Sequence, residues 1–170
     1  EERLGDGKRL GVNVQFIREH QPLGTAGAIG LIEAEVAEPL VITNADLITE
    51  CDFDSMLRFH QKTDCVATIG VREYSHDIPF GVVKLSGTSV LEVSEKPTIS
   101  TFVSAGIYCI SSEGRALVAK GEASNMPDLI NELTEVYPGR ISAFPIHETW
   151  DDVGQLPDLE RVRSHWGEGE

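Results

Sequence analysis

The sequence predicts an α/β fold built around a mostly parallel sheet, with an antiparallel hairpin inserted into it. Strand-like and helix-like segments alternate along the chain, as they do in βα units. The short apolar run at residues 39–43 is typical of a strand buried on both faces. Two strand-like segments flank Ser86-Gly87-Thr88, and this arrangement predicts the hairpin.

In the first half of the chain, the spacing of apolar residues predicts each element. Residues 12–17 alternate apolar and polar side chains as a strand does, and residues 26–36 have the pattern of a helix. A second helix follows the strand at residues 39–43. The residues with helical spacing on one of its faces are Phe53, Met56, Leu57 and His60. Asp52 or Asp54 could cap that helix, and residues 66–71 form another strand.

The second half begins with the hairpin, whose strands are residues 81–85 and 90–94. Residues 102–110 form a long strand, and Ser111 or Ser112 could start a helix that ends near Gly121.

The last elements continue the alternation. Asn125 is the expected N-cap of a helix with Pro127 in its first turn. Its apolar face would be Leu129, Ile130, Leu133, Val136 and Tyr137. Ile141–Pro145 has a strand pattern, and residues 156–166 predict a final helix.

Size and charge limit the classes of function. The chain has 170 residues, 41% of them hydrophobic, which fits one domain over residues 1–170 with a good core. With 28 acidic and 14 basic residues, its formal charge is −14. We therefore expect neither nucleic acid nor a membrane as the main partner, because both need basic surface. A small polyanion such as a nucleotide is compatible with this charge if basic side chains and a divalent cation relieve it locally.

The reactive side chains do not form a nucleophilic or zinc motif. Cys51, Cys65 and Cys109 are far apart and odd in number, so a disulfide framework is not expected and a cytoplasmic setting is the simplest. The five histidines show no metal-ligand spacing, and no Ser-His-Asp or Cys-His arrangement can be argued. We expect chemistry that needs no covalent nucleophile.

Two acidic positions are candidate metal ligands. Asp46 follows the strand at residues 39–43, and ligands of open α/β sheets bind beyond the carboxyl ends of the strands. Asp151 and Asp152 follow another strand, and only one of the two need be a ligand. Acids from separate strand ends can meet at one Mg²⁺, which prefers oxygen ligands. The alternative is that each acid caps a following turn or helix.

Two further segments could contact a ligand. Glu95-Lys96-Pro97 ends the hairpin, where Lys96 could neutralise a phosphate and Glu95 could accept hydrogen bonds from hydroxyl groups. An exposed ion pair is the alternative. Gly81 could let a ligand hydroxyl approach the backbone, although a strand entry or bulge is the favoured explanation on these residues alone.

A glycine-rich turn, Pro22-Leu23-Gly24-Thr25-Ala26-Gly27-Ala28, precedes the first predicted helix. Such a turn can point free N–H groups at a nucleotide or another anion. The same residues also suit a tight turn that has no ligand.

Taken in order, these segments resemble the sugar-1-phosphate nucleotidylyltransferases, also called NDP-sugar pyrophosphorylases. The matching motifs are Gln21-Pro22-Leu23-Gly24-Thr25-Ala26-Gly27-Ala28, Asn44-Ala45-Asp46, Pro79-Phe80-Gly81-Val82-Val83, Glu95-Lys96-Pro97, Ser104-Ala105-Gly106-Ile107-Tyr108 and Trp150-Asp151-Asp152-Val153-Gly154. Each is weak alone, but six in family order are a strong signal, and they span nearly the whole chain. The Leu-Gly-Thr-Ala-Gly-Ala wording looks most like the guanylyltransferases that act on mannose 1-phosphate or heptose 1-phosphate.

The resemblance implies a Rossmann-like fold and one reaction, in which a sugar 1-phosphate attacks the α-phosphate of a nucleoside triphosphate and pyrophosphate leaves. By analogy Asp46 and Asp152 would bind Mg²⁺, and Lys96 would contact the sugar phosphate. Glu95, Gly81 and Ser104 would lie at the sugar. The base and ribose would be lined by Leu23, Gly24, Thr25 and Gly27.

Two departures from the family pattern leave alternatives open. Ser104 stands where family members usually have Asn, and the N-terminal Gly-rich segment of the family is absent, so the chain looks like the C-terminal two-thirds of the domain. The enzyme hypothesis therefore competes with a non-catalytic nucleotide- or sugar-binding regulatory module. A related glycosyltransferase is disfavoured because Asn44-Ala45-Asp46 lacks the second acid of a DxD pair. Self-association into a homo-oligomer is left open.

Overall fold

The computed structural model describes residues 1–32, 39–154 and 162. The chain forms two compact units, which are described separately. The first unit contains Glu1–Leu40, Asp64–Ala67 and Ile110–Ile141, and the second contains Val41–Thr63, Thr68–Cys109 and the residues from Ser142 onward. None of the helices among the described residues is long and apolar enough to cross a membrane.

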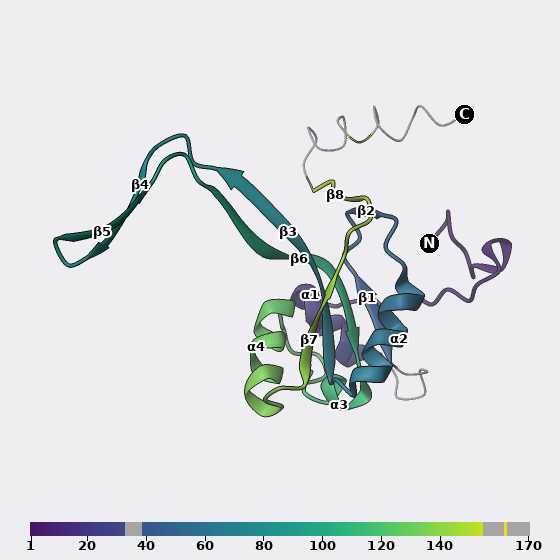
Figure 1. Ribbon diagram of the computed structural model, residues 1–170. Coiled ribbons are helices and arrows are strands. Elements are labelled where there is room, and N and C mark those ends of the chain that lie inside the picture. Colours follow the sequence, from purple (N-terminus) through teal and green to yellow (C-terminus); the bar gives the residue numbers. More distant parts are fainter. Residues whose placement is uncertain (33–38, 155–161, 163–170) are drawn as a thin grey trace. The chain divides into compact units, whose positions relative to one another are not determined.

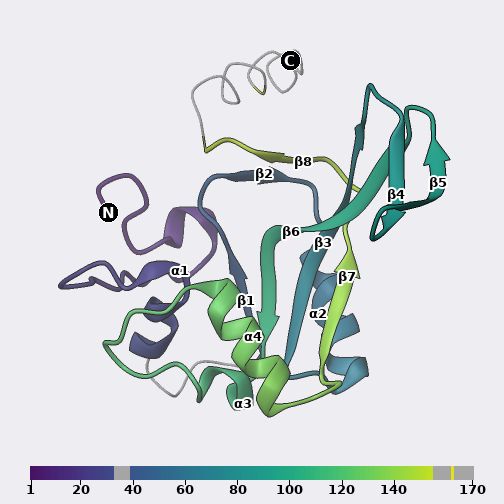
Figure 2. The ribbon, with the colours of Figure 1, turned by 90° about the vertical axis from the view of Figure 1, so that its left-hand side faces the viewer.

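A four-stranded sheet, most of whose residues belong to the second unit, is the main element of the fold. Its strands lie in the order β1 (Leu40–Thr43), β6 (Thr98–Ile110), β3 (Ala67–Asp77) and β7 (Ile141–Pro145). β1, β3 and β7 run in one direction and β6 runs in the other (Figures 1 and 2). The α/β class is therefore confirmed, and three of the four strands share one direction. Because β6 lies between β1 and β3, however, only the neighbours β3 and β7 are parallel, and the other two neighbouring pairs are antiparallel.

Helix α2 (Phe53–Thr63) packs in the second unit and follows the predicted pattern. Asp52 is its N-cap, because the Ser55 N–H donates to Asp52 Oδ1 at 2.9 Å. Met56 lies in the hydrophobic core of this unit. The Phe59 ring packs against the tilted ring of Phe144 of β7, with ring centroids 5.5 Å apart. The buried core residues are Cys51, Met56, Ala105, Ile107, Cys109 and Ile146.

The predicted hairpin forms between β4 (Val82–Ser86) and β5 (Ser89–Ser94). Gly87 makes the turn at a φ of +59°, a value that favours glycine. Figure 1 shows the hairpin at the end of a long extension of β3 and β6. The strands are antiparallel, as predicted, and one face presents exposed apolar side chains, namely Val83, Leu85, Val90 and Val93.

A pair of short strands was not predicted. β2 (Leu47–Thr49) pairs antiparallel with β8 (Trp150–Asp152), with Leu47 opposite Asp152 and Thr49 opposite Trp150. Because each strand has three residues, neither shows a periodic pattern that could be recognised in the sequence.

The first unit is built from short helices. They are η1 (Lys8–Leu10), α1 (Gly24–Gly27), η2 (Ala28–Leu31), α3 (Ser112–Arg115) and α4 (Met126–Val136). Asn125 is the N-cap residue of α4, as predicted, but its side chain makes no capping bond. Instead the Met126 N–H donates to the Thr25 hydroxyl at 2.8 Å, so the glycine-rich turn itself caps this helix.

Several sequence predictions are wrong. Residues 12–17 form no strand, because their alternating pattern also suits an extended loop. The helix expected at residues 26–36 is two short pieces up to Leu31, and residues 33–38 lie outside the described residues. β1 alternates half-buried and exposed residues, since it is an edge strand of the sheet rather than a buried central one.

Other departures are smaller. α3 ends at Arg115 rather than near Gly121, although Ser111 caps it as expected. Val136 is exposed, so the buried face of α4 is Met126, Leu129 and Leu133. The helix expected at residues 156–166 lies, apart from Val162, outside the described residues.

Gly24 and Gly121 provide a matched test of the glycine-rich turn. Both have left-handed backbones, with φ of +76° and +80°, so alanine at either position costs about 1–2 kcal/mol. A Cβ at Gly24 would also lie 2.6 Å from both Ser124 O and Asn125 Oδ1, whereas a Cβ at Gly121 would meet nothing within 4 Å. We predict that Gly24→Ala lowers the urea midpoint of unfolding more than Gly121→Ala does. Equal losses would show that the turn is not packed against residues 124–125.

His60 predicts a pH dependence of stability. The side chain is 3% exposed, its Nδ1 lies 2.8 Å from Thr68 Oγ1, and burial lowers its pKa. The unfolded chain therefore binds a proton that the folded chain does not, and stability falls as the pH drops below the ordinary histidine pKa of about 6.5. The loss is at most about 1.4 kcal/mol per pH unit. Between pH 7.5 and 5.5, the free energy of unfolding measured with urea should fall less steeply for His60→Gln than for the wild type or the control His76→Gln. Parallel slopes for all three would contradict this explanation.

Candidate active site

Asp46 and Asp152, the two predicted metal ligands, lie close together in the second unit. The β2–β8 pair places Leu47 opposite Asp152, and the Val153 N–H donates to the Asp46 carbonyl oxygen at 2.8 Å. Both side chains are exposed. Asp151, the neighbouring acid, lies opposite Ile48 and so on the other face of β8 from Asp152.

Gly154 shows that the two carboxylates converge. A Cβ atom on Gly154 would lie 3.1 Å from Asp152 Oδ1 and 3.5 Å from Asp46 Oδ2, so one point next to this glycine is within reach of both oxygens. Asp152 Oδ1 also accepts the Gly154 N–H at 2.9 Å, which fixes its orientation. Any side chain at position 154 would occupy the space between the acids.

This pair of acids fits Mg²⁺ bound together with a substrate. Mg²⁺ usually takes one or two protein carboxylates and completes its shell with water and phosphate oxygens. Among the described residues, no group of three or more His, Cys, Asp and Glu side chains could hold a metal ion by itself. The arrangement therefore suits a cation that arrives with a phosphorylated ligand better than a structural metal.

Two residues anchor the aspartate-bearing segments to β6. The Trp150 indole N–H donates to the Ala105 carbonyl oxygen at 2.8 Å, and the Asn44 backbone N–H donates to the Gly106 carbonyl oxygen at 2.9 Å. Gly106 has a φ of +69°, and a Cβ there would lie 2.8 Å from Asn44 Nδ2. A glycine is therefore required where Asn44 approaches β6.

Two of the predicted sugar-contacting residues, Gly81 and Glu95, lie together. A Cβ at Gly81 would lie 3.2 Å from Glu95 Oε2, so the carboxylate lies over the exposed backbone of that glycine. Lys96 has a φ of +44°, which is strained for a residue with a side chain and is a feature that recurs at functional sites. Figure 1 shows the hairpin next to these residues extending away from β2 and β8. No ion pair with a described residue involves Lys96.

Ser104 has a partner within the protein. Its hydroxyl lies 2.9 Å from the Tyr108 hydroxyl, and the Gly106 N–H points at it from 3.4 Å. Ser104 is therefore an exposed residue whose hydroxyl is already hydrogen-bonded within the protein.

The glycine-rich turn lies in the first unit and uses its N–H groups internally. The N–H groups of Ala26 and Gly27 both donate to the Ser124 carbonyl oxygen, at 2.9 and 3.2 Å. Leu23 and Gly27 are buried, whereas Gly24 and Thr25 are exposed. These two N–H groups are therefore not free to bind a phosphate. The exposed residues Gly24 and Thr25 could lie beside a ligand.

The cysteines are not poised as nucleophiles. All three are buried, and none of them forms a disulfide within the described residues. Burial, then the Glu148 and Asp52 carboxylates, raise the pKa of the Cys51 thiol, and burial raises the pKa of Cys109 to about 11. Because the thiolate is the reactive form, these residues agree with a reaction that needs no covalent nucleophile.

Arg18 and Arg72, two basic residues that could in principle face a phosphate, each have a partner within the protein. Arg18 forms a bidentate pair with the Glu1 carboxylate, with a shortest distance of 2.7 Å, on the surface of the first unit. Arg72 donates to the Glu148 carbonyl oxygen at 2.7 Å and so supports the segment that leads into β8.

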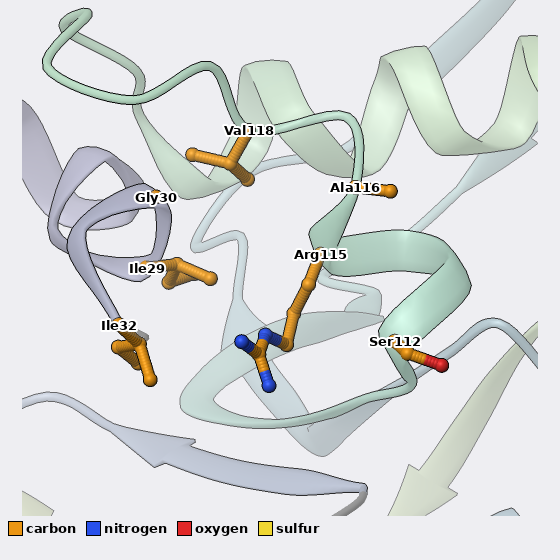
Figure 3. Close-up of a pocket in the computed structure, with 7 residues that line it drawn as sticks. All are labelled: Ile29, Gly30, Ile32, Ser112, Arg115, Ala116 and Val118. Atoms are coloured by element: carbon orange, nitrogen blue, oxygen red, sulfur yellow. The ribbon is translucent and has the colours of Figure 1, made fainter. Parts of the chain in front are cut away.

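The first unit also contains a hollow of about 250 Å³ (Figure 3). The Arg115 guanidinium and the side chain of Ile29 project toward it (Figure 3). Its lining is Ile29, Gly30, Ile32, Ser112, Arg115, Ala116 and Val118. None of the residues predicted to bind substrate or metal is in this lining, so the hollow is not the site indicated by the motifs.

Sequence reasoning missed the residues that support the acids. Asn44, Gly106 and Trp150 were recognised as parts of motifs, but their hydrogen bonds and close approaches join segments far apart in the chain. A signal existed for Gly154 and Gly106, because a glycine beside an acid or within an apolar strand often marks a close approach.

Comparison with known proteins agrees with the motifs. The nucleotidyl transferase family model matches residues 1–168. Mannose-1-phosphate guanylyltransferase catalytic subunit beta from Danio rerio is 30% identical over 159 residues, covering 89% of this chain and 44% of that protein. The chain thus spans less than half the length of this curated relative.

Solved structures share the fold. A Bacillus anthracis protein solved in complex with a sucrose aligns with 98% of this chain and 70% of its own, at a TM-score of 0.72 and 22% identity. HddC from Yersinia pseudotuberculosis, complexed with GMP-PN, aligns with 97% of this chain and 72% of its own, at a TM-score of 0.65 and 20% identity. The match of the family model over nearly the whole sequence, on a fold that these structures share, shows that this chain belongs to the nucleotidyl transferase family.

Proposed function

We propose that the full-length protein is a sugar-1-phosphate nucleotidylyltransferase that transfers GMP from GTP to a sugar 1-phosphate with Mg²⁺. The observation that carries this proposal is the convergence of Asp46 and Asp152 on the space beside Gly154. Family membership supports the reaction class. The guanylyltransferase name of the Danio rerio relative and the GMP-PN complex of HddC support the choice of nucleotide.

In the proposed reaction, an oxygen of the sugar 1-phosphate attacks the α-phosphorus of GTP, and the bond to the pyrophosphate oxygen breaks. Such a transfer depends on positioning and charge neutralisation more than on a protein nucleophile. Mg²⁺, when bound, would neutralise charge on the phosphate oxygens. Asp46 and Asp152 would hold it, while Lys96 would bind the phosphate of the sugar substrate.

The remaining residues would set specificity. Glu95 can accept hydrogen bonds from sugar hydroxyl groups, and its position over Gly81 leaves the glycine backbone accessible beside it. Gly24 and Thr25, the exposed residues of the glycine-rich turn, would face the base and ribose. The buried cysteines, which form no disulfide within the described residues, support the proposed cytoplasmic setting, where thiols stay reduced.

The metal role is tested by single substitutions in the full-length protein. We predict that Asp46→Asn and Asp152→Asn each lower pyrophosphate release at least 100-fold, because an amide cannot supply the negative charge that balances the cation. Asp151→Asn is the matched control and should keep activity within about threefold, since Asp151 lies on the opposite face of β8. Release should be measured with four common nucleoside triphosphates and a panel of sugar 1-phosphates. No release from any pair by the wild type would refute the proposed function, and an active Asp152→Asn would refute the metal role.

The role of Lys96 is tested by comparing the KM values for the two substrates. We predict that Lys96→Met raises the KM for the sugar 1-phosphate by about tenfold or more while the KM for GTP changes little, because only the sugar phosphate would contact this ammonium group. Lys84→Met, which removes an exposed lysine from the same hairpin, is the control and should leave both constants unchanged. An equal rise of both KM values in Lys96→Met would show that Lys96 does not select the sugar substrate.

A further inference from the structure

The segments that carry Asp46 and Asp152 are tied to neighbouring carbonyl groups of one strand. On β6, the carbonyl oxygen of Ala105 accepts the Trp150 indole N–H at 2.8 Å, and that of Gly106 accepts the Asn44 N–H at 2.9 Å. Asn44 and Trp150 each precede one of the aspartates by two residues. The backbone of β6 therefore holds both segments that carry the acids.

The anchor on the Asp152 side is a side chain. In an extended strand, residues two apart lie on the same face, so the placement of Trp150 constrains that of Asp152. Ala105 is 1% exposed and belongs to the hydrophobic core, against which Trp150 also packs. The indole N–H thus bonds to a carbonyl group that is itself held rigidly.

β8 is also held by its pairing with β2, by the bond from the Val153 N–H to the Asp46 carbonyl oxygen, and by the bond from Arg72 to the Glu148 carbonyl oxygen just before it. The strand has three residues, and pairs of short strands are only marginally stable by themselves. Its pairing with β2 places Leu47 opposite Asp152. The β2–β8 pair is, however, separate from the four-stranded sheet, so other contacts must attach it. The Trp150 bond to Ala105 supplies that attachment next to the acid.

We propose that Trp150 is a positioning residue of the cation site, and that its indole hydrogen bond to Ala105 sets the separation of the Asp46 and Asp152 carboxylates. This inference rests on the proposed function, in which these two carboxylates bind Mg²⁺. Hydrogen bonds that orient metal ligands from outside the coordination shell typically change metal affinity by 10–100-fold.

The test is Mn²⁺ binding to the full-length protein in the presence of a saturating non-hydrolysable GTP analogue, measured by electron paramagnetic resonance with Mg²⁺ as competitor. Trp150→Phe keeps an aromatic ring but removes the donor, and its Kd for Mn²⁺ should rise about tenfold. In turnover, the Mg²⁺ concentration for half-maximal rate should rise by a similar factor, while the rate at saturating Mg²⁺ stays within about twofold. A general loss of folded protein would lower the number of bound ions instead of the affinity of each.

The matched control is Thr149→Val. It removes the 2.6 Å hydrogen bond from the Thr149 hydroxyl to Glu50 Oε2, at the same junction but without a partner on β6, and should bind Mn²⁺ as the wild type does. If Trp150→Phe does not fold, 3-benzothienylalanine at position 150 preserves both rings and replaces the N–H with sulfur. Wild-type affinity in a folded variant without the indole N–H would overturn the positioning role and leave the cation site standing. A wild type with no Mn²⁺ site that Mg²⁺ competes for would overturn both.

Discussion

The pairing of β2 with β8 joins parts of the chain that are 100 residues apart, as in the bond from the Thr49 hydroxyl to the Thr149 carbonyl oxygen. The candidate site depends on this long-range contact, because each strand carries one of the two acids at or next to its end. The sheet supplies the frame for the pair. The left-handed backbone of Gly106 allows Asn44 to approach β6, and the carbonyl oxygen of the buried Ala105 accepts the Trp150 indole N–H.

Electrostatics explains why such a site would need a cation. The chain carries a formal charge of −14, and the two converging carboxylates add to the repulsion that any phosphate would meet. A divalent ion between the acids and the phosphates would reverse this local field. Lys96 provides a positive charge at a second place, on the strained backbone that ends the hairpin. In the proposed reaction the acids would hold the cation and the lysine would bind the sugar phosphate, a division that suits a transfer between two phosphorylated substrates.

The sequence predicted the fold class, the hairpin, α2 with its Asp52 cap, and the pairing of Asp46 with Asp152 as candidate ligands. These depend on local patterns or on short motifs, which are visible in one dimension. The strand at residues 12–17 was wrong because alternation occurs equally in an extended loop. β2 and β8 were missed because three residues cannot show a period, and the roles of Trp150 and Gly106 come from contacts between distant segments. The turn at residues 22–28 was predicted as a ligand-binding element, yet two of its N–H groups and the Thr25 hydroxyl bond to the segment around α4.

The central claim is that Asp46 and Asp152 form one cation site on which nucleotidyl transfer depends. The most direct measurement is a crystal structure of the full-length protein soaked with Mn²⁺ and a non-hydrolysable GTP analogue, with data collected at the manganese absorption edge. If the two acids share one cation, an anomalous difference peak should lie within coordination distance of both carboxylates, with phosphate oxygens of the analogue completing the shell. A peak coordinated by other residues, with Asp46 and Asp152 facing solvent, would contradict it.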